Sequence, residues 1–169
     1  MESIIQNKVS ESGLVTINLE LFLPTYPLVS FDLAPFLFMG QILKEKDFRE
    51  AMQTHEWIHF SEKGVAINCS ADAIIPAWAY MLVASKLSGI ASEMYMGTIS
   101  EMEKHLTIKA MSSINLTDFE DKRVVVKGCG DRQIGEYAYM EITRILLPVV
   151  KSIMYGEPCS TVPVYKRKS

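Results

Sequence analysis

Apolar residues recur with two different periods along this chain, and each period predicts a kind of element. Residues 14–20 alternate apolar and polar side chains, which is typical of a strand with one solvated face, and residues 28–33 predict a second strand. Between Gln41 and about His59 the apolar positions follow helical spacing. The N-terminal third therefore predicts two strands followed by a helix.

The rest of the chain alternates short apolar runs with longer helical patterns. The runs that predict strands are residues 65–69, 91–97 and 123–127, and the patterns that predict helices are residues 76–87, 101–114 and 136–151. Residues 161–165 predict a last edge strand, because Pro163 does not suit a central one. This order indicates an α/β fold, with a mostly parallel sheet, helices on both faces, and antiparallel edge strands from the N-terminal third.

Length and charge narrow the class of protein. We expect a single α/β domain over residues 1–169, with N-terminal strands and a helix in 1–60, a βαβαβα core in 61–155, and a cysteine-containing loop and tail in 156–169. A hydrophobic fraction of 49% excludes a disordered chain, and a net charge of -3 offers no basic field for nucleic acid. No signal peptide or membrane-spanning stretch is recognisable, which predicts a cytoplasmic protein without a nucleic-acid or membrane partner.

Two segments of the chain, Val65–Met81 and Val125–Met140, resemble each other. They share a valine, a cysteine, an aspartate, an isoleucine and an Ala-Tyr-Met string when one gap is placed at Ala71. The matched pairs include Cys69 with Cys129 and Asp72 with Asp131. Each segment predicts a strand, a turn and a helix, so we expect both cysteines at the carboxyl edge of one parallel sheet.

The third cysteine, Cys159, lies near a glycine and two prolines that predict a fixed, irregular loop over residues 155–163. If that loop returns over the sheet edge, the thiolates of Cys69, Cys129 and Cys159 converge. Three thiolates suit zinc or an iron–sulfur cluster, with Asp72, Asp131, Glu157 or a histidine as a fourth ligand. The commoner role of such aspartates is to cap the helix that follows them.

Two alternatives stay open beside the metal site. Free cysteines often pack as small buried hydrophobes, and the chain would then be a non-enzymatic protein-interaction module with structural cysteines. The string His55-Glu56-Trp57-Ile58-His59 also matches the zinc-hydrolase pattern, in which two histidines on one helix face bind zinc and the glutamate activates a water. The predicted helix ends soon after His59, and no third ligand stands out. The sequence leaves open whether the protein is an enzyme.

Four strings carry a resemblance that covers nearly the whole chain: Gln41–Arg49, Cys69–Met81, Val124–Asp131 and Met154–Tyr165. Together they resemble a small bacterial family catalogued as domain of unknown function 2480. The resemblance implies no catalytic residues, and the His-Glu-x-x-His string is not a feature of the family. It implies an association with iron–sulfur assembly proteins as partners, which agrees with the three-cysteine hypothesis. A homo-oligomer is a further expectation.

Overall fold

The computed structural model describes residues 5–6, 13–127, 130–157 and 160–168, which form two compact units. Unit 1 comprises residues 1–23 and 104–169, and unit 2 comprises residues 24–103. Each unit has its own sheet and its own buried core. The α/β fold predicted from the sequence is confirmed, with most strand pairs parallel. The unit boundaries differ from the three predicted segments, because an N-terminal strand pairs with strands near the C-terminus. A single domain stays a prediction.

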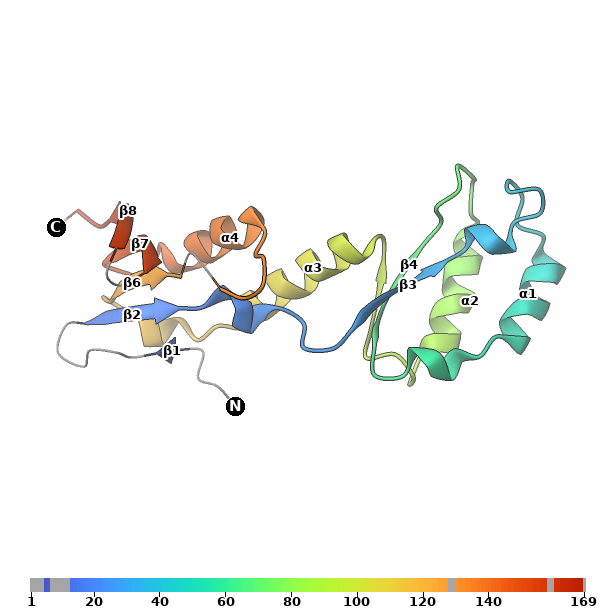
Figure 1. Cartoon of the computed structure of the whole chain (residues 1–169), viewed down its shortest axis with the longest axis horizontal. Helices are drawn as coiled ribbons and strands as arrows, with labels where there is room; N and C mark the ends of the chain where they lie inside the picture. The colour runs from blue at the N-terminus through green and yellow to red at the C-terminus, as the bar shows by residue number, and fades with distance from the viewer. Residues whose placement is uncertain (1–4, 7–12, 128–129, 158–159, 169) are drawn as a thin grey trace. The chain divides into compact units, whose positions relative to one another are not determined.

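Unit 2 is a β-α-β-α-β unit with a parallel sheet in the order β3-β4-β5. Its elements are β3 (Leu28–Asp32), η2 (Ala34–Phe36), α1 (Glu45–Thr54), η3 (Trp57–Phe60), β4 (Gly64–Asn68), α2 (Ala77–Leu87) and β5 (Glu93–Met96). Right-handed crossovers between neighbouring parallel strands place both helices on one face. Figure 1 shows α1 and α2 on the same side of β3 and β4.

Unit 1 contains a five-stranded sheet in the order β1-β2-β6-β7-β8. The three central strands are parallel, whereas β1 and β8 pair antiparallel at the two edges. The strands are β1 (Ile5–Gln6), β2 (Leu14–Ile17), β6 (Arg123–Val126), β7 (Ser152–Glu157) and β8 (Ser160–Lys166). The helices are η1 (Leu19–Phe22), α3 (Ile99–Ser112), η4 (Leu116–Phe119) and α4 (Glu136–Leu146), and the boundary between the units falls within α3.

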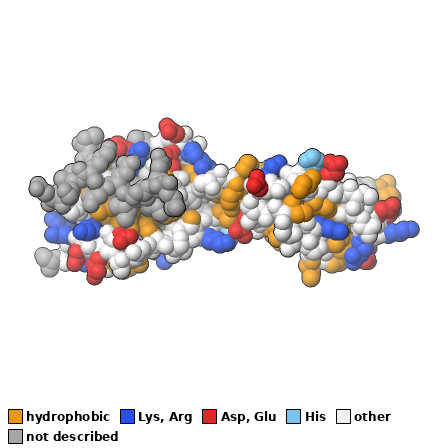
Figure 2. Space-filling view, turned by 90° about the horizontal axis from the view of Figure 1, so that it is seen from below, with side chains coloured by type: hydrophobic (Ala, Val, Ile, Leu, Met, Phe, Trp, Pro, Cys, Tyr) orange, Lys and Arg blue, Asp and Glu red, His pale blue; other side chains and the backbone are white. Residues whose placement is uncertain are grey.

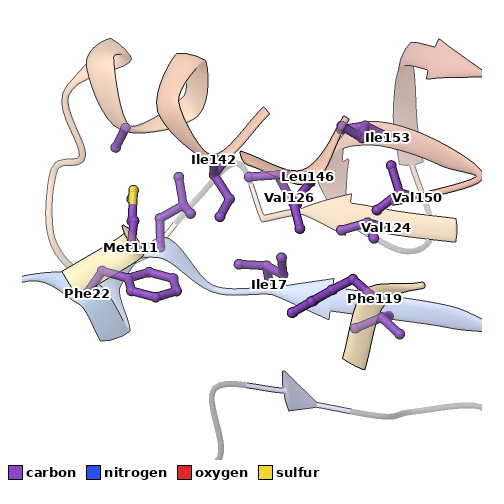
Figure 3. Close-up of a cluster of buried hydrophobic side chains, with 13 residues drawn as sticks. Ile17, Phe22, Met111, Phe119, Val124, Val126, Ile142, Leu146, Val150 and Ile153 are labelled. Carbon is purple, nitrogen blue, oxygen red and sulfur yellow. The ribbon is translucent and has the colours of Figure 1, made fainter. Parts of the chain in front are cut away.

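The core of unit 1 lies between its central strands and α4. Figure 3 shows Val124 and Val126 of β6 beside Ile142 and Leu146 of α4, and all four are buried. Side chains alternate along a strand, so Val125 faces the opposite side of the sheet, where it is also buried. A central strand buried on both faces explains the uninterrupted valine run in the sequence.

The two units repeat one structure, with equivalent residues 59 positions apart. The buried residues Ala79, Val83 and Leu87 of α2 correspond to Ala138, Ile142 and Leu146 of α4. In the sheets, Val65 pairs with Met94 as Val124 pairs with Ile153. The same spacing relates α1 to α3 and η3 to η4, and it makes the buried Met52 equivalent to the buried Met111. The strand–turn–helix repeat predicted from the sequence is therefore the second half of a longer repeat.

The first strand of each unit is also part of the repeat, but the two first strands are separated by a different number of positions. Val15 pairs with Val124 and Val29 pairs with Val65, so β2 and β3 are equivalent although they lie 14 positions apart. At the end of each strand an Asx side chain accepts a hydrogen bond from the backbone N–H two residues later. The acceptor is Asn18, just after β2, in unit 1, and Asp32, the last residue of β3, in unit 2. The complete β-α-β-α-β sequence of unit 2 is thus inserted after the first strand of unit 1.

This equivalence corrects the alignment made from the sequence. β4 and β6 begin 59 positions apart, and so do α2 and α4, so no gap at Ala71 is needed. Without the gap, Cys69 is equivalent to Gly128 and Cys129 to Ser70. The match between the two cysteines was wrong, because it was anchored on residue identity rather than on the alternation of buried strand residues.

The irregular loop predicted over residues 155–163 is also corrected. Most of this segment belongs to β7 and β8, which pair antiparallel from Ser152–Lys166 to Glu157–Ser160. Pro163 is compatible with a strand here because β8 is an edge strand. The final helix ends at Leu146 rather than near Lys151, just before Pro148.

The surface of the described residues mixes charge with exposed apolar groups. Figure 2 shows hydrophobic side chains reaching the surface among charged ones on the face in view. None of the helices in the described part of the chain is long and apolar enough to cross a membrane.

Candidate functional site

Unit 1 contains a cavity of about 1080 Å³. It lies where β2 and β6 end and α4 begins, which is the carboxyl edge of the parallel strands. Ligand sites of open α/β sheets form at this edge. The cavity is also bordered by Met154 and Tyr155 of β7 and by Val164 of β8. Its position and size are those of a small-molecule site.

The apolar part of the cavity comes from α4 and β7. Met140 is 75% exposed and Tyr155 is 43% exposed, although both are large apolar or aromatic side chains. Tyr139 and Tyr155 meet edge to face with ring centroids 5.6 Å apart, which holds the two rings in fixed positions. Exposed apolar groups around a concave surface indicate a place where another apolar group binds.

At its polar end the cavity contains the carboxylate of Glu20. Glu20 accepts a hydrogen bond from the backbone N–H of Arg132 at 2.5 Å, and Asn18 donates a longer one through its side-chain amide at 3.4 Å. The backbone N–H groups of Arg132 and, more weakly, Asp131 lower the pKa of Glu20. The carboxylate therefore fixes the turn that leads from β6 to α4.

Charged residues distinguish this edge of unit 1 from the equivalent edge of unit 2. The cavity is lined by three cations, Lys127, Arg132 and Arg144, and by the acids Glu20 and Glu136. The equivalent residues of unit 2 are all uncharged. In the same order, they are Asn68, Ala73, Ser85, Ala34 and Ala77. Arg144 is held by Glu141 through bonds of 2.6 Å and 3.0 Å. Two copies of one fold have therefore diverged in charge at the carboxyl edge.

The three predicted cysteine ligands fall in different places. Cys69 follows β4 in unit 2, is half-buried, and its thiol donates to the Ala71 carbonyl at 3.6 Å. Cys129 and Cys159 lie outside the described residues. The single sheet edge expected to bring Cys69 and Cys129 together is wrong, because β4 and β6 belong to different sheets. A metal site shared by the three cysteines stays a prediction.

Asp72 and Asp131 are both exposed in the turns before the helices. Neither caps its helix, since α2 begins after Pro76 and α4 begins after Gly135, without a side-chain cap in either case. Within the described ranges, no group of three or more His, Cys, Asp or Glu side chains has the arrangement of a metal site. The role of Asp72 and Asp131 as metal ligands therefore stays a prediction, because it also depends on Cys129 and Cys159, which lie outside those ranges.

The His-Glu-x-x-His string does not lie on one helix. α1 ends at Thr54, and His55 has extended backbone angles. His59 belongs to the separate η3 and contacts Glu56 at 2.6 Å, where both side chains are exposed. His55 packs instead against aromatic rings, with ring centroids 4.8 Å from Trp57 and 5.3 Å from Phe31. The zinc-hydrolase geometry expected from the string is wrong for this segment.

The residues that line the cavity were not among the site residues predicted from the sequence. Lys127, Arg132 and Tyr139 lie in or beside the recognised repeat, but each looked ordinary in isolation. A gapless comparison of the two repeats would have singled out the charged positions, because charge appears in one copy only.

The fold and the site thus define an α/β protein built from two equivalent units, with a cavity at the carboxyl edge of one. A family described as "Protein of unknown function (DUF2480)" matches residues 3–167. The chain belongs to this family, which confirms the resemblance seen in its sequence. No curated protein and no solved structure matches it.

Proposed function

We propose that the protein is a binding protein that takes up a small organic anion with an apolar body in the unit 1 cavity. The observation that carries the proposal is the charged lining of this cavity, which the equivalent positions of unit 2 lack. Duplicated units keep the residues that the fold requires, as the matching buried residues of α2 and α4 demonstrate. Glu20 fixes the turn before α4 and Arg144 pairs with Glu141, but the charges of Lys127 and Arg132 in one copy only are better explained by a ligand than by stability.

The chemistry of the lining supports an amphipathic ligand. Met140, Leu147 and Tyr155 offer an apolar surface, and Lys127 and Arg132 supply positive charge at the carboxyl edge. Glu20 is already engaged by the turn, so its negative charge is partly balanced by backbone N–H groups. A ligand with an anionic group near Lys127 and Arg132 and an aromatic or aliphatic body over α4 and β7 would match both the charged and the apolar part of the lining.

A titration with anilinonaphthalene sulfonate, an aromatic anion whose fluorescence rises in apolar sites, tests this proposal. We expect one saturable site per chain, lost in Met140→Glu and weakened about tenfold in Lys127→Glu, which corresponds to about 1.4 kcal/mol. Met81→Glu is the matched control, because Met81 occupies the equivalent position of α2 with 70% exposure but does not line the cavity. Equal binding by Met140→Glu and Met81→Glu would refute the proposal.

A second candidate function is the binding of zinc or an iron–sulfur cluster by Cys69, Cys129 and Cys159, in a protein accessory to iron–sulfur cluster assembly. One observation favours it: Lys127 and Gly130, which flank Cys129 closely in the sequence, both line the cavity. Three thiolates with an open position suit a cluster, and a fourth ligand suits zinc.

The metal candidate is tested on protein purified without air and without a histidine tag. Iron, sulfide and zinc are measured on the same sample as the visible spectrum, for the native chain and for the serine variant of each cysteine. We expect loss of metal in every variant. Full retention in all three would refute the metal site, and retention in Cys69→Ser alone would refute the three-cysteine form of it.

A further inference from the structure

Both units have a hollow at the same place in the repeat. The one in unit 1 is about 370 Å³ and is lined by residues of η1, α3, η4 and the turn between the last two. The one in unit 2 is about 550 Å³ and is lined by residues of η2, α1, η3 and the corresponding turn. Every residue that lines the hollow of unit 2 has an equivalent in the lining of unit 1, from Phe36 with Phe22 to Phe60 with Phe119. The fold therefore makes the hollow, and the side chains around it decide what each one can bind.

The hollow of unit 2 has more aromatic side chains around it than its counterpart. Three aliphatic residues of unit 1, Ile17, Ile114 and Leu116, are equivalent to Phe31, His55 and Trp57 of unit 2. The phenylalanines common to both linings also differ in exposure. Phe22 and Phe119 of unit 1 are 5% and 0% exposed, whereas their equivalents in unit 2 are half-buried. The fold does not require accessible rings here, since unit 1 is built without them.

Contacts among the rings hold them in fixed positions. The ring centroid of His55 lies 6.4 Å from that of Phe36 and 6.0 Å from that of Phe60. Phe31, which is buried, stacks on Phe36 at 5.7 Å and on Trp57 at 5.3 Å. A ligand that settles against these rings therefore has little side-chain freedom to restrict, which favours binding.

The charged group of this hollow is the carboxylate of Glu56. His59 contacts it at 2.6 Å, and a neutral His59 that donates its ring N–H leaves the negative charge in place. None of the described residues that line the hollow is a lysine or an arginine. Unit 1 also has an acid in its lining, Asp118, but there Ile114 replaces the histidine and both phenylalanines are buried. Of the two hollows, that of unit 2 alone combines accessible rings with a carboxylate.

We propose that the hollow of unit 2 binds an organic cation with a methylated nitrogen, such as a quaternary ammonium group. The faces of aromatic rings attract cations, and surrounding rings are a common means of recognising a quaternary ammonium. Phe36 and Phe60 contact its methyl groups, and Glu56 balances its charge. A hollow of about 550 Å³ has room for a ligand of the size of choline.

This site gives the His-Glu-x-x-His segment a role that needs no metal. His55 joins the rings, and His59 holds the carboxylate of Glu56 beside them. The proposal is independent of the unit 1 cavity, since no described residue lines both.

An NMR titration of the full chain with choline tests the proposal. Dimethylbutanol is the matched ligand, because it has the shape of choline with an uncharged carbon in place of the nitrogen. The titration is made at about pH 8, so that the histidine rings are uncharged. We expect a saturable shift of the Trp57 indole N–H, which donates to the Met52 carbonyl at 3.0 Å beside the ring cluster. Dimethylbutanol should bind at least about tenfold more weakly than choline.

Two variants locate the site. Phe60→Leu removes a ring and should weaken choline binding about tenfold. Glu56→Gln should weaken it about threefold, and Glu62→Gln is its control, because Glu62 is an exposed acid outside the hollow. Absence of saturable choline binding, or equal affinity for dimethylbutanol, overturns the proposal. So does a Glu56→Gln variant that binds as tightly as Glu62→Gln. Both of these substitutions are at exposed positions, so the comparison stands even if Phe60→Leu fails to fold.

Discussion

Asp32 accepts two hydrogen bonds from Ser70, one from the hydroxyl at 2.5 Å and one from the backbone N–H at 2.9 Å. Asp32 ends β3, and Ser70 begins the turn after β4, so the pair joins the first strand of unit 2 to the turn of the second. A third bond, from the N–H of Ala34 at 2.9 Å, starts η2. One carboxylate thus fixes two loops at the carboxyl edge of the sheet.

Removing this carboxylate should destabilise the protein in a pH-dependent way. Burial alone would raise the pKa of Asp32, but the bonds from Ser70 and Ala34 outweigh it, so the pKa lies below its ordinary value. Because the folded pKa is depressed, the stabilisation is complete above the unfolded pKa of about 4 and is lost as pH falls through the folded pKa.

We expect Asp32→Ala to lower the free energy of unfolding at pH 7 by about 1–3 kcal/mol. Urea unfolding of both chains at pH 7 and in acid measures the difference, which should shrink in acid. Ser70→Ala provides a comparison, since it removes the hydroxyl bond and keeps the backbone one. A difference that does not change with pH would mean that the carboxylate charge has no part in the effect.

A second prediction concerns the close approach of Gly130 to the carboxylate of Glu20 at the carboxyl edge of unit 1. A Cβ at position 130 would overlap the carboxylate of Glu20, which is held by the turn and cannot move without losing the Arg132 hydrogen bond. Gly130→Ala should therefore cost about 1–2 kcal/mol of unfolding free energy. The same substitution in a Glu20→Ala background should cost less. Equal costs in the two backgrounds would contradict this contact.

A third prediction concerns Glu62 and Asp121. They occupy equivalent turns, and their φ angles are 59° and 55°. Both turns are closed by a backbone bond, from Lys63 to Phe60 at 3.2 Å and from Lys122 to Phe119 at 3.1 Å. Glycine adopts such angles without strain, so Glu62→Gly should stabilise the protein by up to about 1 kcal/mol. Asp121→Gly should gain less, since Asp121 also pairs with Arg167.

Thermal unfolding of the glycine variants provides the measurement. Lys63→Gly is the control, because Lys63 does not have a positive φ and glycine there should destabilise by about 0.5–1 kcal/mol. If Glu62→Gly is as destabilising as Lys63→Gly, the left-handed turn is not present in solution.

Most helices and strands could be predicted from the sequence because they depend on local periodicity. The run at residues 123–127 and the helical pattern after Pro76 correspond to β6 and α2 within a residue or two. β7 was missed because the short apolar run around Ile153 follows directly on a helical pattern, and its pairing with β6 and β8 is non-local. The division into two sheets depends on β2 pairing with β6, which no local pattern encodes.

The candidate site was harder to predict, for a physical reason. Cysteines and the His-Glu-x-x-His string are conspicuous in a sequence, but whether such residues can act together depends on the backbone conformation that carries them. His55 and His59 need a continuous helix to share a face, and α1 ends before the first of them. Lys127 and Arg132 do not stand out in the sequence. They can be recognised as candidate site residues only when the repeat shows that the equivalent positions of unit 2 are uncharged.

Substitutions of the two histidines should therefore have unequal effects. His55 contacts the rings of Phe31, Phe36, Trp57 and Phe60, so His55→Ala should lower the unfolding free energy by about 1–3 kcal/mol. His59 is exposed and contacts only Glu56 among the contacts described, so His59→Ala should change it by less than about 0.5 kcal/mol. A zinc-binding pair would behave differently, because removal of either ligand releases the metal. Chemical unfolding with zinc analysis on the same samples distinguishes the two interpretations. Equal destabilisation by the two variants, accompanied by loss of bound zinc, would restore the hydrolase hypothesis.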